Sequence, residues 1–314
     1  MAKRRYKLKK NVKIGLILFV LLLGVLYLYN DFRYKSTYEY KLTQIGYSLK
    51  EVKLLKENFN ENKLDYLVST QKKDTILIEV LKNTFYKKEN HDRYIDYINK
   101  HKYDTDKAIN EVNINLDYPF YSLNINTDIN KKKLMIVNKY YILNSDYIPE
   151  NLVNVSSDYS WGTNNQLDKE AFENFKIMHT NAKEDGIYLM INSAYRSYND
   201  QEKVYNHFKN KYNEEDADKL AARPGSSEHQ TGLAIDVFST KDTTTGKFAT
   251  SETYLWLKNN SYKYGYILRY PEEKENITGY VFESWHYRYV GIKDAKKIYD
   301  LKITFDEYYG NYLS

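Results

Sequence analysis

The pattern of apolar and polar positions divides the chain into three stretches. Residues 14–29, IGLILFVLLLGVLYLY, are apolar and carry no charge. From 36 to 113, apolar residues recur at the three- and four-residue spacing of amphipathic helices. Beyond about 115–130, runs of aromatic and β-branched residues alternate with further helical patterns. The chain therefore reads as one long apolar helix, a helical region and a mixed region.

The helical region has several start signals. Ser48 followed by Glu51 has the spacing of a capping box, which predicts a helix that continues through Val52 and Leu55. Similar patterns predict helices over 75–86, 93–101 and 104–113. Two histidines of this region, His91 and His101, stand among Lys, Asn and Asp, so we expect both to be solvated. No cluster of catalytic residue types occurs here, which favours a stalk or a small helical domain.

In the mixed region, helices and strands alternate. Helices are predicted over 168–186, 198–212, 252–265 and from Lys293 onwards, and strands over 187–196, 233–238, 266–271 and 280–290. Late strand pairs that follow one another closely favour an antiparallel or mixed sheet with flanking helices. The predicted fold class is α+β, preceded by a transmembrane helix and a small helical domain.

The N-terminus has the features of a membrane anchor. Residues 1–13 carry seven Lys or Arg and no acid, and the apolar run follows directly. A cleaved signal peptide shares both features, but no small-x-small cleavage site follows the run. A basic flank keeps the N-terminus in the cytoplasm. We therefore expect a single-pass membrane protein with a cytoplasmic N-terminus and with everything after Asp31 extracytoplasmic.

Charge and composition narrow the remaining choices. The chain has 47 basic and 42 acidic residues, and without the seven of the basic head the balance is 40 to 42. Such a balance gives no basic footprint for a nucleic-acid partner. The absence of cysteine excludes disulfides and thiolate metal sites. The expected domains are a cytoplasmic head at 1–13, an anchor at 14–30, a helical stalk at 31–125 and a mixed helix-and-strand domain at 126–314, in which the candidate catalytic residues discussed next all lie.

An aspartate in a strand that reads as buried is the first sign of chemistry. In LAIDVF, Leu233, Ile235 and Val237 share one face, while Asp236 points to the other beside the small Ala234. A buried carboxylate is costly unless it is paired or bound to a metal. The glycine-flanked loop before this strand can bring a histidine, His229, close to Asp236.

A third ligand is available in ESWHYRY, which holds His286 and Glu283. Two histidines and an aspartate leave one position open, which is the arrangement of a catalytic zinc rather than a structural one. Glu283 is the candidate general base. In a regular strand it would face away from His286, so we expect a bend at Ser284–Trp285. The alternative is that both histidines are satisfied polar residues and that Asp236 only caps a turn.

The same residues resemble a known signature. Ser227-x-His229-x-x-Gly232-x-Ala234-x-Asp236 followed by Glu283-x-Trp285-His286 resembles the VanY-type zinc D-Ala-D-Ala carboxypeptidases, whose superfamily includes lysostaphin and the hedgehog signalling domain. The stretches SAYRSYNDQ, ARPGSSEHQTGLAID, YGYILRYPEEKENITGY and ESWHYRYVG follow in the family's order. The resemblance covers about residues 130–300 and leaves out the helical region.

The resemblance implies a role for each matching residue. His229, Asp236 and His286 would bind one Zn²⁺, Glu283 would be the catalytic base, and Arg196 would bind substrate and steady the oxyanion. Gln201, Ser227, Tyr270 and Trp285 match positions of the substrate pocket, although Ser227 could equally turn the loop and Trp285 fill the core.

The implied activity is removal of the C-terminal D-Ala from peptidoglycan stem peptides by attack of zinc-bound hydroxide, with the protein attached to the cytoplasmic membrane. Three alternatives stay open. One is an L,D-carboxypeptidase that acts on tetrapeptide stems, and another is an endopeptidase that cuts cross-bridges. The third is a non-catalytic wall-binding protein in which zinc only stabilises the fold.

Overall fold

The chain divides into two compact units in the computed structural model. The structure describes residues 9–162, 164–240 and 245–313. The first unit is Met1–His91 and the second is Asp92–Ser314. Most of the predicted basic head, residues 1–8, lies outside the described residues. The division falls between His91 and Asp92, whereas the sequence places a boundary between 125 and 126. A separate domain at 126–314 stays a prediction.

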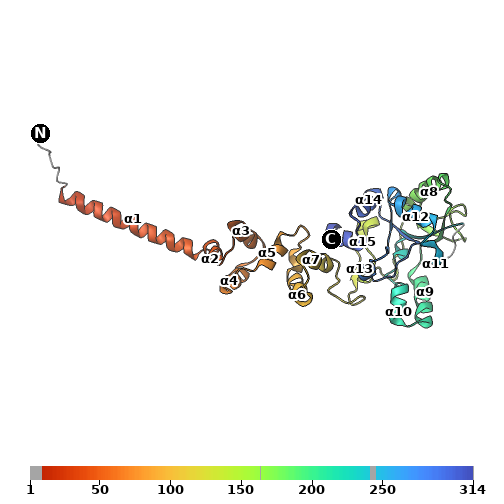
Figure 1. Cartoon of the computed structure of the whole chain (residues 1–314), viewed down its shortest axis with the longest axis horizontal. Coiled ribbons are helices and arrows are strands. Elements are labelled where there is room, and N and C mark those ends of the chain that lie inside the picture. The colour runs from red at the N-terminus through yellow and green to blue at the C-terminus, as the bar shows by residue number, and fades with distance from the viewer. Residues whose placement is uncertain (1–8, 163, 241–244, 314) are drawn as a thin grey trace. The chain divides into compact units, whose positions relative to one another are not determined.

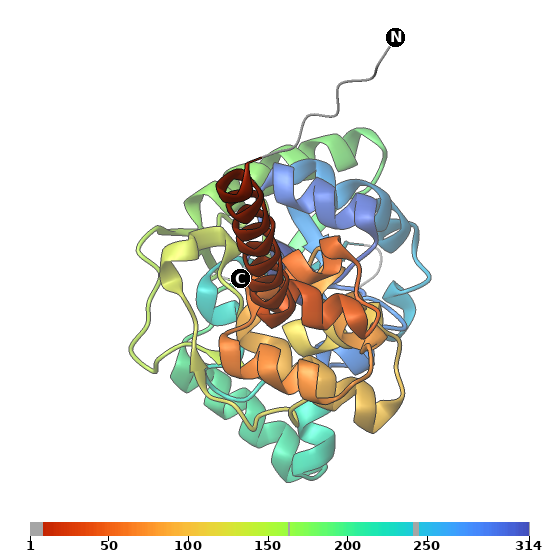
Figure 2. The same cartoon turned by 90° about the vertical axis from the view of Figure 1, so that its left-hand side faces the viewer.

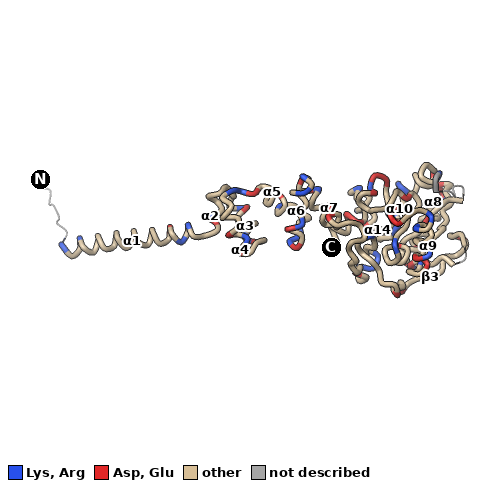
Figure 3. The backbone as a smooth tube through the Cα atoms, turned by 90° about the horizontal axis from the view of Figure 1, so that it is seen from below, with Lys and Arg blue, Asp and Glu red and all other residues tan. Residues whose placement is uncertain are grey.

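The first unit begins with the apolar helix α1 (Lys10–Ser36). Its middle carries no charged residue, and Lys and Arg gather near its two ends (Figure 3). With 27 residues it is about 40 Å long, more than the roughly 30 Å of a bilayer core. By length and composition, α1 is a candidate membrane span.

Four short helices complete the first unit: α2 (Tyr38–Gln44), α3 (Leu49–Asn58), α4 (Glu61–Ser69) and α5 (Thr75–Lys82), followed by the turn η1 (Lys88–Asn90). The predicted capping box is present, because the Ser48 hydroxyl accepts from the Glu51 N–H and the Glu51 carboxylate accepts from the Ser48 N–H. The prediction for His91 is wrong. Its ring lies against Phe59 and Tyr86 and is only 8% exposed, because the aromatic side chains of this region close over it.

The second unit is larger. Its first half contains α6 (His91–His101), which starts at the junction, α7 (Thr105–Asn113), β1 (Ile125–Asn126), η2 (Ile129–Leu134), β2 (Tyr141–Ile142), β3 (Leu152–Asn154), β4 (Gln166–Asp168), α8 (Lys169–Glu184), β5 (Leu189–Ser193), α9 (Tyr198–Lys211) and α10 (Glu214–Leu220). Its second half contains η3 (Glu228–Thr231), β6 (Ala234–Ser239), α11 (Thr245–Phe248), α12 (Glu252–Asn260), η4 (Ser261–Tyr264), β7 (Tyr266–Leu268), α13 (Glu275–Thr278), β8 (His286–Tyr289), α14 (Ile292–Leu301), α15 (Phe305–Tyr308) and η5 (Tyr309–Leu313).

A four-stranded antiparallel sheet with the order β5-β6-β8-β7 forms the centre of this unit. Helices α8, α12 and α14 lie on one side of it, and α9 and α10 on the other (Figures 1 and 2). Ile235 and Val237 of β6 are fully buried in the main core with Phe175 of α8, as their alternation predicts. The α+β prediction with an antiparallel sheet is confirmed.

Three of the four predicted strands are shorter than the sequence predicts, whereas β6 keeps its predicted length and is shifted by one residue. Residues 280–285 do not form a strand, and β8 begins only at His286, although the Trp285 carbonyl still accepts from the Val237 N–H of β6 at 2.9 Å. A turn occupies Ser284–Trp285, where the bend was expected, and the His286 N–H points back to the Glu283 carbonyl at 3.4 Å. This turn is what allows Glu283 and His286 to face the same space.

Candidate active site

Sheet register brings two of the predicted ligands together. Asp236 on β6 lies directly opposite His286 on β8, so that their side chains emerge on the same face. The Asp236 Oδ1 lies 3.1 Å from the His286 Nδ1. Although the two residues are fifty positions apart, antiparallel pairing makes them neighbours.

The third ligand comes from the loop before β6. This loop forms η3 and ends at Gly232, whose φ of +67° belongs to the left-handed region. A Cβ at Gly232 would lie 2.7 Å from Leu152 Cδ2, so both the conformation and the space require glycine. The turn places His229 Nε2 3.5 Å from Asp236 Oδ2. Its Nδ1 lies 2.6 Å from the Ala194 carbonyl, which can only accept, so Nδ1 carries the proton.

The three side chains fit a metal ion. One ligand atom from each of His229, Asp236 and His286 lies within 4.8 Å of the others. Ligands about 2.0–2.1 Å from a tetrahedral zinc lie about 3.3–3.4 Å from one another, which is close to the two measured separations. Since the Nδ1 of His229 is occupied, its Nε2 is the free ligand atom. Two imidazoles and one carboxylate form a donor set that suits zinc.

The charges of His229, Asp236 and His286, which together form the ligand cluster, affect one another's pKa values. Burial opposes ionisation of Asp236, but the two imidazoles hold its pKa far below the usual range. Burial would lower the pKa of His286, yet its contacts with Asp236 and Glu228 raise it to about 9. Burial lowers the pKa of His229, which keeps that ring neutral.

Glu283 lies at the edge of the cluster. Its Oε2 is 3.7 Å from His286 Nδ1, and its N–H donates to the Tyr270 carbonyl at 3.1 Å. Burial raises the pKa of Glu283 to about 7, with Asp236 adding to the effect and His286 opposing it. A carboxyl that titrates near neutrality can accept and release a proton at physiological pH.

Arg196 lies beside the cluster, after the end of β5. Its Nη1 donates to Gln201 Oε1 at 2.8 Å, and its Nη2 to Ser193 Oγ at 2.9 Å. Gln201, which is 1% exposed, also donates to the Ala222 carbonyl. Gln201 therefore orients the guanidinium, a contact that its predicted role in substrate binding did not include. The Ser193 contact was not predicted.

All nine predicted site residues line one pocket of about 200 Å³: Arg196, Gln201, Ser227, His229, Asp236, Tyr270, Glu283, Trp285 and His286. The Ser227 side chain makes no capping hydrogen bond to η3. The Tyr270 ring lies 5.0 Å from that of His286. Trp285 stacks on Phe238 and so contributes to the core as well as to the pocket wall.

Known proteins share this part of the chain. Residues 164–292 match the sequence model of the VanY family, described as D-alanyl-D-alanine carboxypeptidase. A bifunctional D-Ala-D-Ala dipeptidase and D-Ala-D-Ala carboxypeptidase of Enterococcus gallinarum, VanXYC, is 32% identical over 181 residues, which are 56% of this chain and 93% of the relative. This chain belongs to the VanY family.

Solved structures agree with the family assignment. The LdcB LD-carboxypeptidase is 39% identical and covers 58% of this chain and 87% of its own, with a TM-score of 0.55. A mutant of the vancomycin-resistance D,D-pentapeptidase VanY from a VanB-type resistance cassette, solved with Zn(II), is 34% identical and covers 56% and 98%, with a TM-score of 0.50. The chain spans only 49–66% of the length of the first curated relatives it matches.

Behind the VanY-family site lies a group of charged residues that the sequence analysis missed. Glu228, Arg269 and Arg288 have no exposed side-chain surface, and Asp306 has only 4%. The alternation of side chains along a strand could have pointed to Arg288. It follows His286 by two positions in β8, so both side chains lie on the same face. Asp306 lies beyond the residues that match the family.

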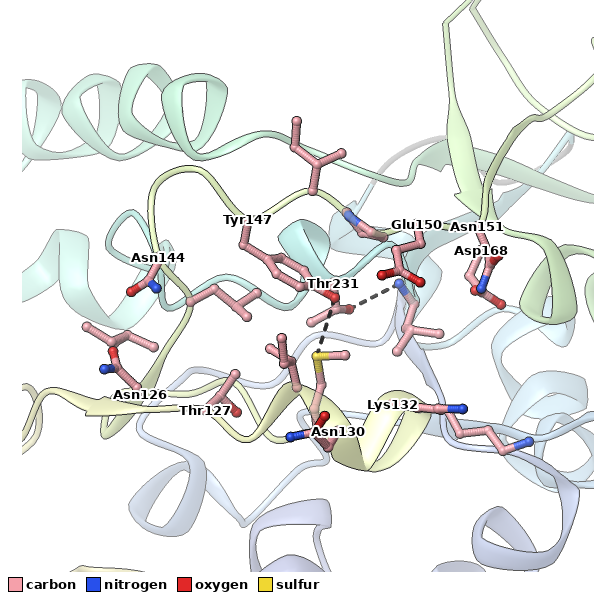
Figure 4. A pocket seen from close by; sticks show the side chains of 18 of the residues that line it. Asn126, Thr127, Asn130, Lys132, Asn144, Tyr147, Glu150, Asn151, Asp168 and Thr231 are labelled. Atoms are coloured by element: carbon pink, nitrogen blue, oxygen red, sulfur yellow. Dashed lines mark hydrogen bonds between the residues drawn. The ribbon is translucent and has the colours of Figure 1, made fainter.

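A larger pocket of about 710 Å³ lies elsewhere in the second unit (Figure 4). Asn126, Asn130, Asn144, Tyr147 and Thr231 are among the side chains around it. Of the described residues that line it, none belongs to the nine predicted for the site. The smaller pocket is the one that His229, Asp236, Glu283 and His286 line.

Proposed function

We propose that this chain is a membrane-anchored zinc carboxypeptidase that removes the C-terminal D-Ala from peptidoglycan stem peptides. The observation that carries the proposal is the convergence of His229, Asp236 and His286 with Glu283 in one pocket. Membership of the VanY family and the Zn(II) complex of a related VanY mutant support it.

Zinc would be held by His229 Nε2, one oxygen of Asp236 and His286 Nδ1. When bound, zinc acts as a Lewis acid and lowers the pKa of water at its open position. The Ala194 carbonyl fixes the His229 ring, so that its Nε2 is directed at the site.

Glu283 is the proposed general base and acid. Its buried carboxylate accepts a proton from the water that attacks the scissile carbonyl. The same proton then passes from Glu283 to the departing amine of D-Ala, so that one water is consumed and two products form. The pKa of about 7 suits both steps.

Arg196 is the proposed partner of negative charge on the substrate. The hydrogen bonds that its Nη1 and Nη2 donate to Gln201 and Ser193 fix the plane of the guanidinium. A preoriented donor of this kind stabilises the charge that develops on the carbonyl oxygen. Ser227, Tyr270 and Trp285 would line the remainder of the peptide site.

We infer that α1 attaches the protein to the cytoplasmic membrane, with the second unit outside. The support is its length, its apolar composition and the basic residues before it. This topology places the site in the compartment that contains peptidoglycan.

The closest alternative is an L,D-carboxypeptidase that acts on tetrapeptide stems with the same residues. The LdcB LD-carboxypeptidase is 39% identical to this chain, whereas the zinc-containing VanY mutant is 34% identical. We expect the preference between stems to depend on the walls of the pocket, because the same metal ligands and base would serve both reactions.

One experiment separates these alternatives. The full chain in detergent, loaded with zinc, is incubated with pentapeptide and tetrapeptide muropeptides, and the products are followed by mass spectrometry. Loss of one D-Ala from the pentapeptide alone supports the D,D assignment, and loss from the tetrapeptide alone supports the L,D assignment. Cleavage of cross-linked dimers only would indicate an endopeptidase. No cleavage despite bound zinc would contradict the enzyme proposal and favour the wall-binding protein.

A further inference from the structure

The two candidate histidine ligands are held in different ways. His229 points its Nδ1 at a backbone carbonyl, whereas His286 points its Nε2 at the Glu228 carboxylate, 3.6 Å from Oε2. Both of these buried atoms, His286 Nε2 and Glu228 Oε2, make no hydrogen bond within the described part of the chain. Since burial of an unpaired polar atom is costly, two such atoms that face each other require an explanation.

The surroundings of Glu228 leave that one oxygen available. Its Oε1 accepts from Arg269 Nε at 2.7 Å and from Arg288 Nη1 at 2.9 Å. Both guanidinium groups lie on this oxygen, so Oε2 remains for His286. The carboxylate cannot turn away, because its other oxygen is fixed on two sides by buried cations.

The two arginines are fixed in turn. Arg269 makes a two-fold contact with the Asp306 carboxylate, at 2.6 and 3.2 Å. Arg288 donates to the carbonyls of Lys133 and Met135. Two acids and two arginines balance one another, so this group needs no further ion for its own neutrality. It is a rigid support directly behind a metal ligand.

We propose that Glu228 is a positioning residue for His286, accepting a hydrogen bond from its Nε2–H so that Nδ1 is the atom that binds the metal. This inference rests on the proposed zinc site. The two histidines then ligate through different nitrogens, Nε2 of His229 and Nδ1 of His286. A carboxylate behind a ligating imidazole fixes the ring and raises its basicity.

The support reaches beyond the residues that match the family. Asp306 belongs to α15, after the matched range of 164–292. Asn138 donates to Asp306 at 2.8 Å and so fixes it from a second segment. Residues on both sides of the family-matched segment therefore contribute to the position of His286.

The first test uses the unmodified full chain in detergent with ¹⁵N-labelled histidine. Long-range ¹H–¹⁵N spectra before and after addition of Zn²⁺ report which ring nitrogen is protonated and which binds metal. We expect two rings to respond, one with a protonated Nδ1 and one with a protonated Nε2. Two rings that both ligate through Nε2 would overturn the inference while leaving the zinc site intact. No response to zinc would contradict the proposed function itself.

The second test measures Zn²⁺ affinity by competition with a chromophoric chelator. Loss of an outer carboxylate typically lowers metal affinity about 10–100-fold, which is the effect expected for Glu228→Gln. If that variant does not fold, Asp306→Asn takes its place, with an expected loss of at most about tenfold, because it loosens Arg269 and Asn138 and leaves the Glu228 carboxylate in place.

The matched control is Asp117→Asn, which weakens another partly buried ion pair of the same unit, with Arg93. It should lower the melting temperature without changing zinc affinity or the histidine spectra. A folded Glu228→Gln protein with zinc affinity within about twofold of the unmodified chain would show that Glu228 only supports the fold.

Discussion

Two glutamates, one from each compact unit, show how differently the same side chain is used. Glu51 in the helical unit accepts from the Ser48 N–H and pairs with Lys73 and Lys82. These contacts, the Ser48 N–H first, lower its pKa to about 2. Glu228 is enclosed completely, with two arginines on one oxygen and a histidine facing the other.

The difference lies in what each carboxylate fixes. Glu51 closes the first turn of α3 and holds flexible lysines whose ends reach solvent, so its contribution is local. Glu228 lies where burial makes every charge costly unless it is paired. Such a group persists only if its neighbours are placed accurately, and one of those neighbours is His286. Glu228 therefore differs from Glu51 mainly in being completely shielded from solvent, and less in the number of its partners.

The largest effect is expected from Glu283→Gln, which keeps the size of the side chain and removes the base. Turnover should fall about 10²–10⁴-fold, while zinc affinity changes little because Glu283 is not a ligand. Rates with a muropeptide substrate and chelator competition measure the two quantities. The control is Glu275→Gln, the same change at an exposed position of α13. Full activity of Glu283→Gln would refute its role.

A smaller effect is expected from Arg196→Lys, which keeps the charge but loses the planar fork that Gln201 and Ser193 orient. We expect kcat/KM to fall about 10²-fold with unchanged zinc affinity. Steady-state kinetics with the preferred stem peptide provide the measurement. An unchanged kcat/KM would indicate that Arg196 contacts no reacting group.

The next effect concerns pH and His286. Its pKa is raised to about 9, so the metal-free folded protein holds a proton that the unfolded chain releases near pH 6.5. The associated stability is complete below about pH 6.5 and is lost as pH rises through about 9. Zinc must displace this proton. The affinity of the protein for Zn²⁺ should therefore rise by up to about tenfold for each pH unit between pH 7.5 and 9.

Chelator competition across this range tests the expectation, and calorimetry in two buffers should detect the release of about one proton per zinc. Thermal unfolding of the metal-free protein should show the opposite trend, with a lower melting temperature at pH 9 than at pH 7.5. A zinc affinity that does not change with pH would show that His286 is already neutral.

The smallest effect is expected in the helical unit. Glu51→Gln removes the charge that pairs with Lys73, at a cost of about 1–2 kcal/mol in the free energy of unfolding of that unit. Activity on soluble muropeptides should stay within about twofold. Denaturant unfolding and rate measurements on the same preparation test both statements. A large loss of activity would show that the helical unit acts on the site.

Local sequence patterns predicted much of the fold and the ligand set. Most helices begin within a few residues of their predicted starts, because caps and apolar spacing are encoded locally. Strand ends were less accurate, since 280–285 has strand-like residues but turns at Ser284–Trp285, so that only the Trp285 carbonyl bonds to β6. His91 was misjudged because its polar neighbours in sequence are not its neighbours in space.

By itself, the sequence determined the residue types that can bind zinc, the glycine that turns His229 toward the sheet and the apolar length of α1. Only the tertiary structure decided which nitrogen of each histidine faces the cluster and which carboxylate supports it. Residue type and spacing depend on neighbours along the chain. The pairing of Glu228 with Arg269, Arg288 and His286 depends on segments up to sixty residues apart, joined by strand register and by the exclusion of water.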